Sequence, residues 1–191
     1  MAIVIPATPI PTRVRLTPET AAAVLTSPFS FAQDSEQHPG ERWLLEAEFP
    51  LMEAVDGGPI VSAFALAGRF DTFTFAVAIP ARGTATTFTP TGGGGGTKSL
   101  PISPGLTGTL KNGDNIEVND GTDKRLYIVT ADVAAAATTI PVWPTLRGTP
   151  GAPVAVGAVS RGTFRLRENG LPYDVVPPSL YDIIVQAVEA L

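Results

Sequence analysis

Prolines and glycines interrupt this chain so often that long helices are disfavoured over most of its length. Nineteen of its 191 residues are proline and another nineteen are glycine. Proline breaks a helix interior, and glycine costs it about 1 kcal/mol relative to alanine. The segments between these breaks are short, which favours many short strands joined by turns. The sequence therefore predicts a mainly β fold.

Residues 41–49 carry the clearest strand pattern in the chain. Their apolar side chains fall at alternate positions and two acidic side chains occupy positions between them: Trp43, Leu45, Ala47 and Phe49 on one side, Glu46 and Glu48 on the other. Successive side chains of a strand point to opposite faces of a sheet. We therefore expect one buried face and one wet face.

Weaker patterns predict the other elements. Alternation of apolar and polar residues predicts strands at 13–16, 72–79 and 163–167. Residues 181–191 alternate weakly and could be a strand or a short helix, of which we favour the strand. A Thr-Pro helix start predicts a short helix at 21–25. A second helix is expected after Asp56-Gly57-Gly58-Pro59, with apolar residues at helical spacing up to a terminal glycine, Gly68.

Residues 110–148 form a compact β unit. Strand patterns at 115–118 and 126–130 flank an Asp-Gly turn, a strong hairpin signal because both residues tolerate positive φ. A third strand at 139–144 contains prolines, which cannot donate to a ladder, so we expect it at a sheet edge. The glycine-rich segment 81–99 before this unit is expected to be a flexible loop on the surface.

Charge and composition exclude several classes of function. The net charge of -5 disfavours nucleic-acid binding, which usually requires a basic face. No stretch has the ~18 apolar residues of a membrane-spanning helix, so we expect no membrane insertion. The apolar N-terminal residues follow no charged segment, which argues against a signal peptide. The absence of cysteine excludes disulfides and thiol chemistry and fits synthesis in a reducing cytosol.

The glycine-rich segment matches a phosphate-binding loop only in part. Gly92, Lys98 and Ser99 stand at the spacing of G-x-x-x-x-G-K-[ST], but Thr97 occupies the position of the second glycine. Prolines follow where a helix would have to begin. Without a helix N-terminus a phosphate lacks both the aligned N–H groups and the dipole. We therefore interpret the segment as a loop.

Templates for metal binding and hydrolysis also fail. Aligning Gly121 with the invariant glycine of a calcium loop puts Ile116 where the first carboxylate is required. Glu46 and Glu48 share a strand face, but paired carboxylates catalyse glycoside cleavage only across a cleft. The single histidine, His38, has no second histidine or cysteine for a metal. We expect no enzymatic activity, no cofactor and no metal.

An ordered set of short motifs runs along residues 27–191. The set comprises Ser27-Pro28-Phe29 followed by Gln37, Gly40-Glu41-Arg42-Trp43 leading into Phe49-Pro50, Gly68-Arg69 before a strand, Lys111-Asn112-Gly113-Asp114, residues 125–132 and 142–147, Phe164-Arg165-Leu166, and Glu189-Ala190-Leu191. Together and in this order, these motifs resemble the distal tail proteins of long-tailed bacteriophages and of gene-transfer-agent particles.

The resemblance implies a fold, a role and partners. It implies a β-sandwich or split-barrel core with one or two short helices and long loops, here with an N-terminal arm at 1–26 and a single β-rich domain at 27–191. Such proteins form a six-fold ring at the tail tip, made in the host bacterial cytoplasm and incorporated into the virion. The implied partners are other copies of the chain in a homohexamer, the tail tube protein, the tail hub protein, the tape-measure protein and tail fibres. The length leaves no room for the carbohydrate-binding domain of larger family members.

Four residues of the 110–148 unit are candidates for contacts in such a ring. They are basic or aromatic, and arginine is enriched at interfaces although it is common on surfaces: Lys124, Arg125, Trp143 and Arg147. Charge reversal at the three basic positions is expected to weaken assembly before it weakens folding, although Arg147 could equally cap a loop. Three other functions stay open: another tail component such as a tube or tail-completion protein, a host-surface carbohydrate-binding β-sandwich, and a cell-wall-cleaving enzyme.

Overall fold

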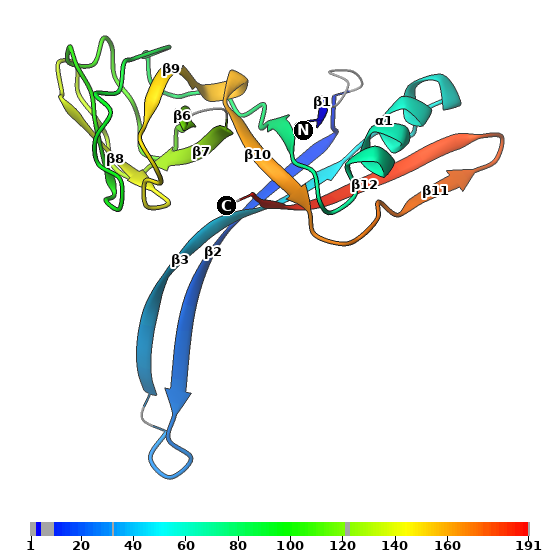
Figure 1. The fold of residues 1–191 in the computed structure, drawn as a ribbon, viewed down its shortest axis with the longest axis horizontal. Coiled ribbons are helices and arrows are strands. Elements are labelled where there is room, and N and C mark those ends of the chain that lie inside the picture. Colours follow the sequence, from blue (N-terminus) through cyan, green and yellow to red (C-terminus); the bar gives the residue numbers. More distant parts are fainter. Residues whose placement is uncertain (1–2, 5–9, 32, 121–122, 191) are drawn as a thin grey trace.

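The computed structural model describes residues 3–4, 10–31, 33–120 and 123–190, which form two β-sheets and one α-helix (Figure 1). The side chains of residues 3–4, 37–39 and 152–153 lie outside the description. The first sheet curls into a half-barrel and the second lies beside it. The expected mainly β fold of the sandwich or split-barrel kind is thereby confirmed.

The first sheet has seven strands in the order β1-β4-β10-β12-β3-β2, with β11 paired to part of β12. Only the pair β1–β4 is parallel. The strand bounds are β1 Ile3–Val4, β2 Arg13–Thr26, β3 Gln33–Glu48, β4 Phe73–Ala76, β10 Arg161–Leu166, β11 Tyr173–Val176 and β12 Leu180–Glu189. The predicted buried face of residues 41–49 is confirmed, and residues 181–189 belong to a strand, as favoured from the sequence.

The second sheet has five antiparallel strands in the order β5-β8-β7-β6-β9. Their bounds are β5 Ser99–Pro101, β6 Asn115–Asp120, β7 Asp123–Val129, β8 Thr139–Trp143 and β9 Gly151–Val156, followed by a 3-10 turn η1 at Gly157–Val159. The predicted hairpin is confirmed, with Asp120 opposite Asp123, while residues 121–122 of its turn lie outside the description.

The expected edge position of residues 139–144 is wrong, because β8 lies between β5 and β7. Pro141 is tolerated there because it faces the end of the β7 ladder. Its carbonyl accepts a hydrogen bond from the Thr130 N–H at 3.0 Å, and no donor is required of it. The next residue, Val142, bonds to the segment that leads into β5, because its N–H donates to the Lys98 carbonyl at 2.9 Å.

Strand β7 separates two hydrophobic cores. Leu126 packs in the first core with Trp43, Phe73 and Phe164, and Tyr127 on the opposite face packs in the second core. Because side chains of a strand alternate between faces, one strand can serve as a wall between both cores. The predicted 110–148 unit therefore includes the element that joins the two halves of the molecule.

Helix α1 (Ala54–Ala67) confirms the predicted helix but begins earlier than expected, so that Pro59 lies inside it. Pro59 lies beyond the first turn, because the Gly57 N–H already donates to the Glu53 carbonyl, so the helix forgoes one hydrogen bond at Pro59. The predicted apolar stripe is buried at Ile60, Phe64 and Ala67. Gly68 ends the helix at φ 50°, and its N–H donates to the Phe64 carbonyl.

Two sequence-based expectations differ from the structure. Residues 21–25 are a strand rather than a helix, because they pair with β3 from Ala22 opposite Gln37 to Thr26 opposite Gln33. The boundary at residue 26 therefore falls inside a β-hairpin. The 81–99 segment is a mostly exposed loop, as expected, but it is anchored at some points: Phe88 is buried in the second core, and the Gly96 N–H donates to the Leu146 carbonyl at 2.8 Å. Strands β9 and β11 were not anticipated.

Two adjacent glycines of α1 should respond oppositely to alanine. A Cβ on Gly57 would lie 2.7 Å from the Cβ of Tyr181, whereas a Cβ on Gly58 would meet nothing within 4 Å. We expect Gly57→Ala to lower the free energy of unfolding by about 1–3 kcal/mol through overpacking. Gly58→Ala should raise it by up to about 1 kcal/mol, because alanine favours the helix. Urea unfolding followed by circular dichroism measures both; equal effects would contradict the close packing.

Candidate functional site

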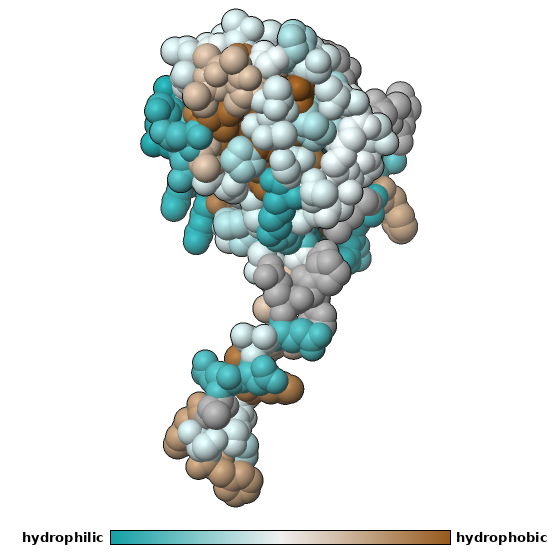
Figure 2. All heavy atoms as spheres, turned by 90° about the vertical axis from the view of Figure 1, so that its left-hand side faces the viewer, coloured by the Kyte–Doolittle hydropathy of each residue, from teal (hydrophilic) through white to brown (hydrophobic). Residues whose placement is uncertain are grey.

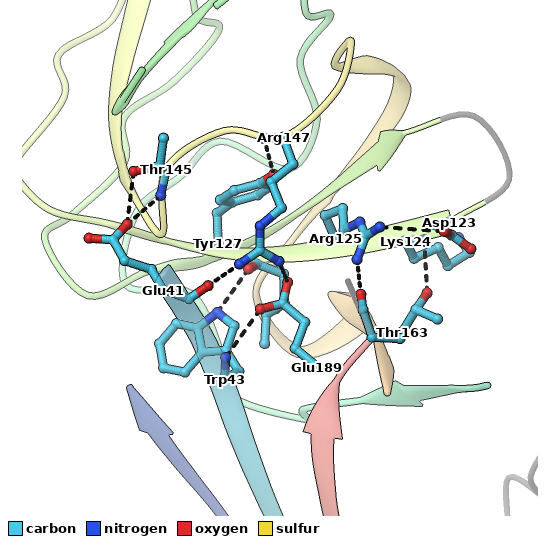
Figure 3. A network of polar contacts seen from close by, with 12 residues as sticks. Glu41, Trp43, Asp123, Lys124, Arg125, Tyr127, Thr145, Arg147, Thr163 and Glu189 are labelled. Carbon is cyan, nitrogen blue, oxygen red and sulfur yellow. Dashed lines mark hydrogen bonds and ion pairs between the residues drawn. The ribbon is translucent and has the colours of Figure 1, made fainter. Parts of the chain in front are cut away.

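The four interface candidates from the sequence lie at the junction of the two sheets, where they make contacts within the chain. Figure 3 shows three of them: Lys124, Arg125 and Arg147. Lys124 and Arg125 belong to β7, Trp143 ends β8, and Arg147 follows in the next loop. Their partners come mainly from β3 and β12 of the first sheet and from the C-terminal residues after β12. We call this set of contacts, centred on Glu41, Trp43, Arg147 and Glu189, the joint.

Arg147 and Glu189 form the ion pair of the joint, in which the carboxylate is buried and the arginine side chain is 25% exposed. Nη1 of Arg147 lies 3.2 Å from Oε1 of Glu189, whose side chain is only 2% exposed. The backbone N–H of Trp43 donates to the other carboxylate oxygen of Glu189 at 3.1 Å. Nη2 of Arg147 donates to the Glu41 carbonyl. Burial raises the pKa of Glu189, and Arg147 and the Trp43 N–H offset this only in part. One guanidinium thus links the second sheet to both β3 and β12.

Glu41 forms a second ionic contact across the joint. Its side chain is 5% exposed and lies 2.5 Å from Nζ of Lys98. The N–H and the hydroxyl of Thr145 donate to its other oxygen at 2.7 and 2.9 Å. Burial opposes ionisation of Glu41, but Lys98 and Thr145 outweigh it and hold the pKa of this carboxyl below its usual value. This carboxylate ties β3 to the end of the glycine-rich loop.

The two tryptophans of the chain meet at the joint. Their ring centroids are 4.6 Å apart and their planes are at 87°, an edge-to-face contact. Nε1 of Trp43 donates to the Leu126 carbonyl at 2.9 Å, so the indole also bonds to β7. Edge-to-face aromatic pairs contribute about 0.5–1.5 kcal/mol beyond their buried area. Trp143 therefore packs within the chain through this contact and remains half-buried.

Lys124 and Arg125 are also engaged within the chain. Nζ of Lys124 pairs with Glu117, and the backbone N–H of Lys124 donates to the Thr163 hydroxyl at 3.0 Å. Arg125 is 7% exposed and donates to the Ala190 carbonyl. Reversing a buried charge leaves its partners uncompensated. In contrast with the sequence-based expectation, we now expect charge reversal at Arg125 or Arg147 to weaken folding first.

The residues that failed the ligand templates have structural contacts. Lys98 of the glycine-rich loop pairs with Glu41, and a strand rather than a helix follows it. Asp114 accepts hydrogen bonds from the N–H groups of Arg82, Gly83 and Lys111 at 2.7–3.0 Å, which fixes the loops around it.

The remaining carboxylates are distributed along the sheets. Glu46 and Glu48 are half-buried on the outer face of β3, and Glu48 lies 4.0 Å from Arg13. Among the residues that the structure describes, no three histidine, aspartate or glutamate side chains are grouped as metal ligands. The side chain of His38 lies outside the described residues. In the same described part of the chain, no helix is long and apolar enough to span a membrane.

A hairpin formed by β2 and β3 projects from the body (Figure 1). We call its outer part, residues 21–40, the arm. The side chains described in the arm are exposed, apart from the half-buried Ser27. The apolar ones lie toward the tip and are exposed by 58, 72, 97 and 80% respectively: Val24, Leu25, Phe29 and Phe31. Figure 2 shows the arm as a narrow projection with hydrophobic residues at its end.

The arm has little in the chain to hold it. At its base Gly40 permits the two strands to approach closely, since a Cβ there would lie 2.9 Å from the Cβ of Ala21. At its tip the Phe31 N–H donates to the Ser27 carbonyl at 2.9 Å. An isolated two-stranded ribbon is marginally stable in water. The arm is therefore the segment of this chain that most needs a partner.

No known protein-family model matches this chain, and no curated protein sequence matches it.

Sequence reasoning found four members of the joint as interface candidates but missed Glu41, Lys98 and Glu189. One signal was available for Glu41, which has the same strand parity as Trp43 and Leu45. A carboxylate on the buried face of a strand requires a partner. No comparable local signal marks Glu189, since its partners come from distant parts of the chain.

Removing the charge of Glu41 tests the ionic contact with Lys98. We expect Glu41→Gln to lower the free energy of unfolding by about 1–3 kcal/mol at pH 7, because it weakens bonds to Lys98 and Thr145. The folded pKa is depressed, so this stabilisation is present above the unfolded pKa and is lost as the pH falls through the folded value. The difference between variant and wild type should therefore shrink in acid.

The matched control is Glu46→Gln on the outer face of the same strand, with an expected change within about 0.5 kcal/mol. Urea unfolding between pH 3 and 7 measures all three proteins. A Glu41→Gln protein as stable as the control at pH 7 would show that the contact contributes nothing.

The Arg147–Glu189 pair should show the opposite dependence on pH. Arg147→Met leaves a buried carboxylate uncompensated and should cost about 3–5 kcal/mol at pH 7. Burial already raises the pKa of Glu189, and loss of Arg147 raises it further. The folded state then holds a proton that the unfolded state releases, so the variant should regain stability as the pH falls from 7 toward 5.

Glu189→Gln added to Arg147→Met serves as the check on this reading. The double variant should recover part of the lost stability at pH 7 and lose the added pH dependence. If both proteins showed the same pH profile, Glu189 would not be the group responsible.

Proposed function

We propose that this chain is a structural subunit of a phage tail tip, forming a homohexameric ring that joins the tail tube to the hub and fibre machinery. The observation that carries the proposal is the arm. A ribbon whose apolar tip residues, Phe29 and Phe31, are 97 and 80% exposed is costly for a monomer to leave in water. Ring subunits need such reaching elements, because each contacts two neighbours.

The positions of the resemblance motifs support the same proposal. Motifs far apart in the sequence meet at the joint, where Trp43 contacts Trp143 and Arg147 pairs with Glu189. Another motif, Ser27-Pro28-Phe29, lies at the tip of the arm. The shared residues thus serve the internal geometry and the arm rather than a catalytic centre. Such a distribution is what a protein that works by assembly requires.

Native mass spectrometry and negative-stain electron microscopy of the purified full chain test the proposal. We expect a closed ring of six copies, and gold-labelled antibody on virions should mark the end of the tail distal to the capsid. The control is a variant whose arm is replaced by Asn-Gly between Thr20 and Glu41, which should keep the fold but not form rings. A wild-type chain that remains monomeric, or a label along the tail shaft, would contradict the proposal.

A further inference from the structure

An apolar groove of about 840 Å³ lies at the root of the arm, between the two sheets. Its apolar surface includes Trp43, Trp143 and Ile128. The more exposed residues of its lining include Ile79, Asn112 and Thr130. Its volume is within the about 300–1,000 Å³ of pockets that hold drug-sized ligands. It therefore has room for more than one aromatic side chain.

The tip of the same arm cannot fill this groove. The strands of the arm remain paired out to Thr26 opposite Gln33. At about 3.4 Å per residue, the end of β2 lies roughly 20 Å beyond Thr20, which lines the groove. The apolar tip residues Phe29 and Phe31 and the apolar groove thus lie at opposite ends of the arm.

We infer that the groove receives the arm tip of a second copy of this chain, with Phe29 and Phe31 seated against its apolar lining. The inference rests on the proposed function, which it deepens by naming the acceptor surface. A tip and a groove on different parts of one subunit make a heterologous, head-to-tail contact. Such contacts close into a ring when the rotation between neighbours permits it.

The charges of the two surfaces are complementary. The arm carries the exposed carboxylates Asp34 and Glu36 and has no lysine or arginine in residues 21–40. Arg82 and Lys111 are exposed beside the groove. Lys111 is paired with Asp132 at 2.8 Å, which leaves Arg82 as the basic group that this surface offers to the arm. The Arg82 guanidinium lies 2.9 Å from the position of a Cβ on Gly113, a lining residue. Opposite charges around an apolar contact favour docking of the tip in the groove and disfavour contact between two acidic tips.

Two full-length variants separate the two halves of the contact. The tip variant carries Phe29→Asp and Phe31→Asp, and the groove variant carries Ile79→Asp and Thr130→Asp. We expect each alone to associate at least about tenfold more weakly than wild type in sedimentation velocity. Mixed in equal amounts, they should form a dimer with one copy of each, because one intact tip and one intact groove remain. Native mass spectrometry distinguishes this dimer by its mass.

Phe70→Asp is the matched control, because Phe70 is 94% exposed after α1 and belongs neither to the arm nor to the lining of the groove. It should associate as wild type does. Equal weakening in this control, self-association of the tip variant, or absence of the mixed dimer would overturn the inference. Rings that persist in the tip variant would overturn the inference and leave the proposed function intact, whereas a monomeric wild type would contradict both.

The cysteine-free chain permits a direct measurement of the contact. Phe29→Cys combined with Ile79→Cys should give a ladder of disulfide-linked multimers on oxidation of the assembled protein. Neither single variant should extend beyond a dimer. A dominant dimer from Phe29→Cys alone would instead indicate contact between two tips and overturn the inference.

Discussion

The ion pair between Arg147 and the buried carboxylate of Glu189 is the interaction on which the rest of this structure depends. The two cores meet at β7, whose Leu126 packs in the first core, but apolar packing alone has no preferred direction. A guanidinium has a rigid fork, so its bonds to Glu189 and the Glu41 carbonyl fix the position of the second sheet against β3 and β12. Because buried ion pairs contribute little net stability, we interpret this one as specifying geometry, as a hypothesis for this protein.

That geometry matters because the arm and the groove both begin at the joint. Strand β3 holds Glu41 and Trp43 within the joint and continues into the arm, with a shift in its pairing to β2 between Glu41 and Gln37. The groove shares Trp43 and Trp143 with the joint. Any rotation between the sheets would therefore change the shape of the groove and the direction of the arm relative to it. In a proposed ring of identical subunits, such a change would repeat at every contact.

The parts of this fold that could be predicted from sequence are those whose information is local. Alternating apolar and polar residues predicted the strand at 41–49 and the β6–β7 hairpin. Apolar residues at helical spacing and a terminal glycine predicted most of α1. Residues 21–25 were wrongly predicted as a helix because their pairing with residues 33–37 decides their structure. Strand β11 is exposed along its whole length, so it has no apolar alternation to detect. Likewise, Arg147 could be flagged by residue type, but its partner Glu41 lies 106 positions away.

The weakness of the arm as an isolated element suits it to assembly. A ribbon with no core of its own gains little from being ordered in a monomer, and ordering each residue costs about 1–2 kcal/mol of backbone entropy. A partner that covers Phe29 and Phe31 would supply the apolar burial that the chain itself cannot, since the arm points away from its own groove. Ordering of the arm and association would then be coupled, and assembly would depend steeply on concentration. The body, whose two cores are complete without the arm, would fold first and present a finished groove.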